Sequence, residues 1–145
     1  MERLNNEIRD AELDDGGAAV DLVVFVEEDG KQKAYIAHIG NTETWLARNG
    51  VAYVLTNSHA FSMKMLEMGV INLLGAVKHQ QKNVLFKVLH GKPEDVQEMN
   101  VQVVSIELKE GDRLLTFSDG VGDVVREHSV NNPEKNLYYH NMVKK

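Results

Sequence analysis

The 145-residue chain is predicted to form one α+β domain, in which an antiparallel sheet or sandwich carries helices on one face. Short runs rich in β-branched residues, separated by Asp-Gly and Asn-Gly turns, occupy residues 20–56 and recur after residue 100. Helical spacing of apolar residues dominates the stretch between them. A chain of this length buries about 70% of the surface that its unfolded form exposes, which is sufficient for a core.

The first half of the chain predicts an antiparallel meander. Its predicted strands cover residues 20–26, 33–39, 43–48 and 51–56. The first of these strands is almost continuously apolar, which is typical of a strand that is covered on both faces. Asp29-Gly30 and Asn49-Gly50 are the turn signals that connect the strands as hairpins.

The second half predicts helices followed by two more strands. Helical spacing covers residues 62–68 and 73–89, and the strands cover residues 101–108 and 113–117. We expect Asn83 to cap the apolar stripe that ends the second helical stretch. After the last strand, Ser118-Asp119-Gly120 predicts a turn, and Asp123 is expected to cap a short helix.

Composition narrows the function classes. The net charge of −6 argues against a nucleic-acid partner, which would need a clustered positive face. The chain has no cysteine, which excludes disulfides and thiolate zinc sites. No apolar run approaches the ~18 residues of a membrane span and no signal peptide opens the chain, so we expect a cytoplasmic protein without membrane contact. We divide it into an acidic N-terminal arm (residues 1–17), a core (residues 18–127) and a polar C-terminal tail (residues 128–145).

Ser118-Asp119-Gly120 carries the sharpest chemical signal, because a carboxylate at the end of a buried strand is held rigidly and glycine lets a ligand approach the backbone. Several other segments add to it in order and spacing: Ala37-His38-Ile39-Gly40-Asn41-Thr42, Arg48-Asn49-Gly50, Leu55-Thr56-Asn57-Ser58-His59 and Lys82-Asn83-Val84-Leu85. Together with residues 108–125 they resemble the bacterial form of the type 2C metal-dependent protein phosphatases. The resemblance covers about residues 17–125.

This resemblance implies a shortened α-β-β-α sandwich of antiparallel sheets with flanking helices. It also implies two Mn²⁺ or Mg²⁺ ions, whose bound water attacks a phosphoserine or phosphothreonine. Such hard cations prefer carboxylate oxygens. The chain departs from the family here. It lacks a counterpart of the family's early Asp-Gly-His-Gly-Gly segment. In addition, Asn41 stands at the aspartate position of the family's sequence pattern, which is roughly Gly-Asp-Ser-Arg.

Asp119 keeps its carboxylate and is the main candidate metal ligand, with the backbone of Gly120 beside it. The further candidates are weaker ligands or uncertain substitutes, namely Asn41, Asp14, Asp15 and His140. Asp14 and Asp15 are read either as substitutes for lost ligands or as an acidic turn that ends a helix. His140 is the nearest match to the family's last ligand, but a histidine nitrogen suits Mg²⁺ poorly. No residue is assigned as catalytic, and His38 and His59 are expected to pack and to orient a loop.

Two functional readings remain open. In the first, the chain is a phosphatase-like domain with impaired catalysis and weak or absent metal binding, which acts as a binding or regulatory module for a phosphoprotein or another protein chain. In the second, it is an active Mn²⁺- or Mg²⁺-dependent serine/threonine phosphatase with a rearranged site built on Asp119. We also expect a homo-oligomer, because loss of the family's first strands would leave the apolar strand of residues 20–26 exposed.

Overall fold

The computed structural model describes residues 3, 6–7, 17–89 and 101–132. Two three-stranded antiparallel sheets form its centre. The first sheet has the order β1-β2-β5 and contains β1 (Val20–Glu28), β2 (Lys31–Ile39) and β5 (Gln102–Glu107). The second sheet has the order β4-β3-β6 and contains β3 (Glu43–Arg48), β4 (Val51–Val54) and β6 (Arg113–Phe117).

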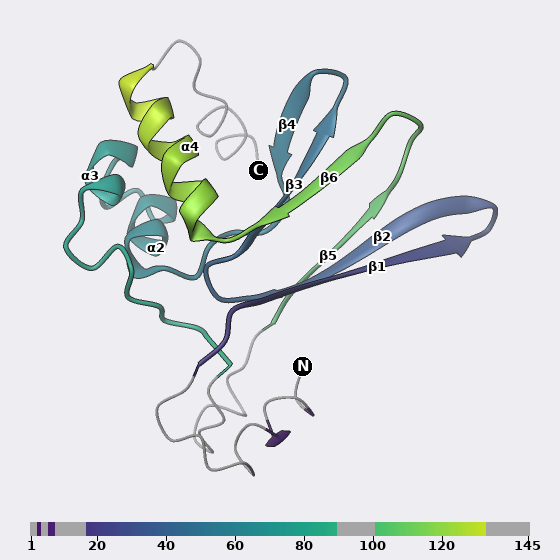
Figure 1. The fold of residues 1–145 in the computed structure, drawn as a ribbon, viewed down its shortest axis with the longest axis horizontal. Helices are drawn as coiled ribbons and strands as arrows, with labels where there is room; N and C mark the ends of the chain where they lie inside the picture. Colours follow the sequence, from purple (N-terminus) through teal and green to yellow (C-terminus); the bar gives the residue numbers. More distant parts are fainter. Residues whose placement is uncertain (1–2, 4–5, 8–16, 90–100, 133–145) are drawn as a thin grey trace.

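The helices gather on one side of the molecule, beside the second sheet (Figure 1). They are α2 (Phe61–Glu67), α3 (Leu73–Val77) and α4 (Asp119–Asn131). A cluster of buried residues lies between them and the second sheet, and it includes Trp45, Val54, Met63 and Leu73. This arrangement of two antiparallel sheets with helices confirms the predicted α+β class. No helix in the described residues has the length and apolar character that crossing a bilayer requires.

Both predicted hairpin turns are confirmed. Asp29 and Gly30 have φ angles of 54° and 71°, and Asn49 and Gly50 have φ angles of 53° and 75°. Two consecutive positive φ angles are characteristic of the type I′ turn, whose twist matches that of the flanking strands. The first turn fixes the register from Glu28 opposite Lys31 onward along the β1–β2 pair.

A buried polar network ties the two sheets together. In the first sheet, the Nδ1 atom of His38 lies 2.5 Å from one carboxylate oxygen of Asp21. The other carboxylate oxygen of Asp21 accepts a hydrogen bond of 2.8 Å from Thr44 Oγ1, in the second sheet. The Nε2 atom of His38 lies 2.9 Å from the carbonyl oxygen of Asn57. Because that oxygen can only accept, Nε2 carries a proton.

The expectation that the strand at residues 20–26 is covered on both faces is wrong. β1 is an edge strand, paired with β2 alone among the described strands. The exposed fractions of Leu22, Val24 and Phe25 are 52%, 46% and 62%. The reason is the placement of the helices, since all three described helices of more than one turn lie beside the other sheet (Figure 1).

The helix predicted to reach residue 89 is also wrong in its second part. α3 ends at Val77, and Asn83 caps no helix. Leu85 instead forms an isolated antiparallel bridge with Ala60, and Leu89 forms one with Ala18. The apolar spacing of residues 84–89 suggests a helix. In the structure, backbone N–H and C=O groups of this segment instead form hydrogen bonds with distant segments.

The segment after the last strand is more regular than predicted. Ser118 is the N-cap residue of α4, and Asp119 is its first residue rather than part of an open turn. Asp123, expected as a cap, lies inside this helix. The helix continues to Asn131. The boundary drawn between core and tail, after residue 127, therefore falls inside this helix.

Candidate functional site

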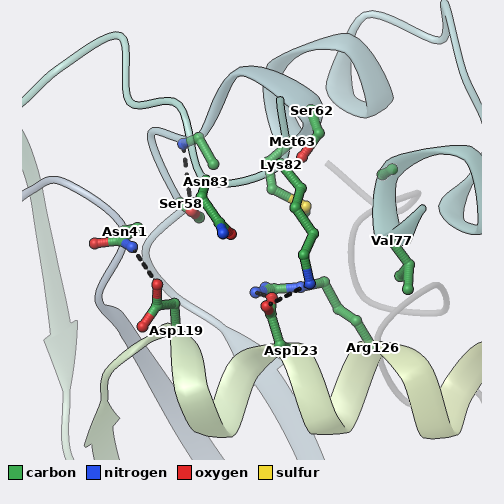
Figure 2. Close-up of a pocket in the computed structure, with 12 residues that line it drawn as sticks. Asn41, Ser58, Ser62, Met63, Val77, Lys82, Asn83, Asp119, Asp123 and Arg126 are labelled. Carbon is green, nitrogen blue, oxygen red and sulfur yellow. Dashed lines mark hydrogen bonds and ion pairs between the residues drawn. The ribbon is translucent and has the colours of Figure 1, made fainter. Parts of the chain in front are cut away.

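Asn41 and Asp119, two of the candidate residues, are brought together by strand pairing. Asn41 follows β2, and Asp119 follows β6 directly. The pairing of β3 with β6 places Glu43 opposite Phe117, which brings these two strand ends side by side. Asn41 Nδ2 donates a hydrogen bond of 2.6 Å to Asp119 Oδ2 (Figure 2).

A small polar cavity opens beside this pair. Its volume is about 20 Å³, enough for about one water molecule. Its polar lining comes from the β2–β3 connection, the segment around α2, the loop after α3 and one face of α4, namely Asn41, Ser58, Ser62, Lys82, Asn83, Asp119, Asp123 and Arg126. Asp119, Asp123 and Arg126 share a face of α4 because their spacings are four and three residues.

The backbone beside Asn41 is firmly held. Gly40 has a φ of 105°, in the region that favours glycine, and a Cβ at this position would overlap Ala19. His59 Nδ1 accepts a hydrogen bond of 3.0 Å from Gly40 N, and His59 N donates one of 2.7 Å to Gly40 O. Burial and the neighbouring His38 lower the pKa of His59 from 6.5 to about 4, so His59 is neutral and able to accept. His59 therefore orients this loop, as the sequence predicts.

Charged residues connect α4 to the second sheet behind the cavity. Arg126 Nη1 donates to Glu43 Oε1, and the side chains of Arg126 and Glu43 are only 6% and 1% exposed. Trp45 Nε1 donates to the other carboxylate oxygen of Glu43 at 2.9 Å. Gly122 leaves room for the pair, because a Cβ there would lie 3.0 Å from both Arg126 Nη2 and Glu43 Oε1. A buried charge pair with this many partners is locally satisfied.

Both carboxylate oxygens of Asp123 are engaged by cations. Arg126 Nη2 donates to Oδ1 at 2.8 Å, and Lys82 Nζ donates to Oδ2 at 3.2 Å (Figure 2). Burial of Asp123 acts to raise its pKa, but the hydrogen bonds from Arg126 and Lys82 outweigh that effect and the pKa is lowered. Asp123 is therefore an ionised carboxylate inside an ion-pair network.

Sequence reasoning missed Glu43, Arg126 and Lys82 as members of this site. One signal was available: Glu43 stands where the quoted family text has arginine, so a charge of opposite sign occupies a strand position next to Asn41. Its partner could not be found from the sequence, because Arg126 lies 83 residues away on a helix that was expected to be short.

Comparison with known proteins gives this geometry a context. The chain matches no family model. It is 29% identical over 132 residues to the serine/threonine phosphatase Stp of Listeria innocua, covering 88% of this chain and 49% of that protein. It is 28% identical over 115 residues to a putative type 2C protein phosphatase of Streptococcus pyogenes, covering 79% of this chain and 43% of that protein. The same Gly-Asn-Thr and Ser-Asp-Gly segments that meet in the structure carried the resemblance in the sequence.

The chain is similar in sequence to bacterial serine/threonine phosphatases, including one of the 2C type.

Solved structures of bacterial serine/threonine phosphatases share its fold. The Mycobacterium tuberculosis serine/threonine phosphatase PstP/Ppp superposes with a TM-score of 0.70 at 23% identity, covering 97% of this chain and 60% of that one. The catalytic domain of PstP in complex with two manganese ions superposes with a TM-score of 0.68 at 22% identity, covering 99% of this chain and 60% of that one. The type 2C-like chain spans about half the length of the curated relatives it matches.

The described residues of this type 2C-like chain do not fit a two-manganese centre. Among residues 17–89 and 101–132, no three histidine, aspartate or glutamate side chains converge as metal ligands would. Asn41 presents an N–H donor to Asp119, whereas a metal would need its oxygen. Asp14, Asp15 and His140 lie outside the described residues. Gly120 adjoins Asp119 in the first turn of α4, where its backbone position is set by the helix.

Proposed function

We propose that this chain is a type 2C phosphatase-like domain with impaired catalysis, which acts by binding other protein chains. The observation that carries the proposal is the hydrogen bond from Asn41 Nδ2 to Asp119 Oδ2. At the position where the family sequence has a second aspartate, the chain has a neutral amide, which donates a hydrogen bond to one oxygen of Asp119.

Charge neutralisation explains why this substitution disables the site. Two divalent ions bring four positive charges, which hard-cation sites balance with several anionic oxygens. The cavity offers the carboxylates of Asp119 and Asp123, and Asp123 is already paired with Arg126 and Lys82. Water bound at such a site would not be acidified enough to attack a phosphate ester at neutral pH.

For the binding role, we propose a second copy of the chain as the partner, joined through the edge of β1. The nine-residue strand exposes Leu22, Val24 and Phe25. Its acidic residues are Glu27 and Glu28 at one end and Asp21 near the other, and the Asp21 side chain is buried against His38. An antiparallel register that sets Val23 opposite Val23 of the second copy would also set Leu22 opposite Val24. This pairing is apolar over most of its length and places the acidic ends away from each other, which favours association.

Phosphatase assays test the catalytic part of this proposal. The chain would be incubated with Mn²⁺ and a small aryl phosphate, beside the Listeria innocua phosphatase as a positive control and an Asp119→Ala variant as a negative one. We expect the parent chain and Asp119→Ala to be equally inactive. Metal-dependent turnover by the parent that is abolished in Asp119→Ala would overturn the proposal and favour an active phosphatase, with Asp119 assisted by Asp14, Asp15 or His140.

A further inference from the structure

Two cationic side chains line the same cavity as Asn41 and Asp119. Lys82 reaches it from the loop after α3, and Arg126 reaches it from α4 (Figure 2). They converge on Asp123, where each takes one carboxylate oxygen. Each oxygen of this carboxylate keeps a second lone pair, but the two cations neutralise the negative charge that would attract a metal ion.

The charges around the cavity are nearly balanced without any added ion. The carboxylates of Glu43, Asp119 and Asp123 bring three negative charges, and Lys82 and Arg126 bring two positive ones. The formal charge of this group is therefore −1, from three negative charges less two positive ones. A site with so little excess negative charge attracts a divalent cation weakly, and the two fixed cations repel it.

The two cations differ in how firmly they are held. Arg126 is 6% exposed and bonded to both Glu43 and Asp123, so it is a permanent part of the core. The side chain of Lys82 is 40% exposed and bonds Asp123 at the rim. An exposed lysine pair of this kind contributes little to stability, so Lys82 can be replaced without loss of the fold.

We propose that Lys82, supported by Arg126, is an internal counter-ion that excludes divalent cations from this cavity. The side-chain ammonium neutralises the carboxylate of Asp123 that a metal ion would otherwise share with Asp119. This inference rests on the proposed function, because it explains how the domain keeps its acidic residues without binding metal. Lys82 prevents divalent cations from binding, and the buried Arg126 contributes a second positive charge at a fixed position.

Mn²⁺ titration by calorimetry tests the role of Lys82. Asn41→Asp provides a background in which a second carboxylate makes binding measurable, and Asn41→Asp/Lys82→Gln is compared with Asn41→Asp/Lys78→Gln. Lys78 is exposed and is not part of the cavity lining, so this control removes the same charge elsewhere. A unit charge about 6 Å from a divalent ion changes its affinity about ten-fold even at the dielectric constant of water. We expect Asn41→Asp/Lys82→Gln to bind Mn²⁺ about ten-fold more tightly than Asn41→Asp, with no change for the Lys78 control.

The outcomes separate this inference from the proposed function. Equal effects of Lys82→Gln and Lys78→Gln, or no binding by any of the three variants, would overturn the role of Lys82. Tight Mn²⁺ binding by the parent chain without aryl phosphate turnover would also overturn this inference, whereas aryl phosphate turnover by the parent chain would overturn the proposed function. Lys82→Met in the same background provides a second variant. The rise in melting temperature on addition of Mn²⁺ provides a second readout, which does not depend on activity.

Discussion

Arg126 in α4 and Glu43 in β3 form an ion pair across the core, although 83 residues separate them in the sequence. Both side chains are almost completely buried. The pair attaches the helix that begins with Asp119 to the strand that follows Asn41. It therefore controls where the two halves of the candidate site lie relative to each other.

Removal of one partner of this pair should destabilise the fold strongly. Arg126→Met leaves the carboxylate of Glu43 buried without a counter-ion, which typically costs about 3–5 kcal/mol. Glu43→Gln/Arg126→Met should recover most of that loss, because the neutral amide oxygen still accepts from Trp45 Nε1. Urea denaturation measures both, with the exposed Lys78→Met as the control for charge loss. A single variant as stable as the parent would show that the pair is not formed.

The buried His59 should make the fold less stable in mild acid. Its pKa is lowered from 6.5 to about 4 in the folded chain, so the unfolded chain binds more protons between these values. The stabilisation from neutral His59 is complete above about pH 6.5 and is lost as the pH falls toward 4. Between about pH 7.5 and pH 5, this group should account for about 2 kcal/mol of the free energy of unfolding.

Comparison with His59→Gln isolates that contribution. The glutamine amide oxygen can still accept from Gly40 N but does not titrate. Urea denaturation at the two pH values should show a smaller loss for His59→Gln than for the parent. The assignment fails if the two proteins lose the same stability on acidification.

A lysine in the edge strand should prevent self-association. Val24 lies in β1 and is 46% exposed, and a lysine on an exposed edge is a common way to block strand pairing. Val124→Lys is a matched control, because Val124 in α4 is 64% exposed and distant in the chain from the edge. Multi-angle light scattering should give a dimer mass for the parent and the control, and a monomer mass for Val24→Lys. A monomeric parent at high concentration would remove the basis for the β1 interface.

Local patterns predicted much of the fold. The strands at residues 43–48 and 113–117 were predicted with their observed bounds, because turn residues delimit each one. Residues 84–89 were mispredicted because apolar spacing cannot distinguish a helix from an irregular segment that bridges Ala60 and Ala18. The exposure of β1 could not be predicted either, since it depends on which sheet the helices cover.

The candidate site was predictable only in part. Asn41 and Asp119 were identified from short segments, and the structure places them in contact. Lys82 lay in a segment that carried the resemblance but had no assigned role, and Arg126 lay in no motif. A cation acquires a role at this site only through the three-dimensional position of Asp123. Pairings between distant charged residues depend on tertiary geometry, which spacing along the chain does not encode.

The two hydrogen bonds between His59 and Gly40 have a consequence for any attempt to engineer a metal site at this turn. Because the N–H and the C=O of Gly40 are both engaged and Ala19 lies against its α-carbon, the backbone at the rim cannot rearrange around an incoming ligand. An engineered site would therefore have to be obtained by exchanging side chains on a stationary backbone, and crystals grown with and without a bound ligand should superimpose at this turn.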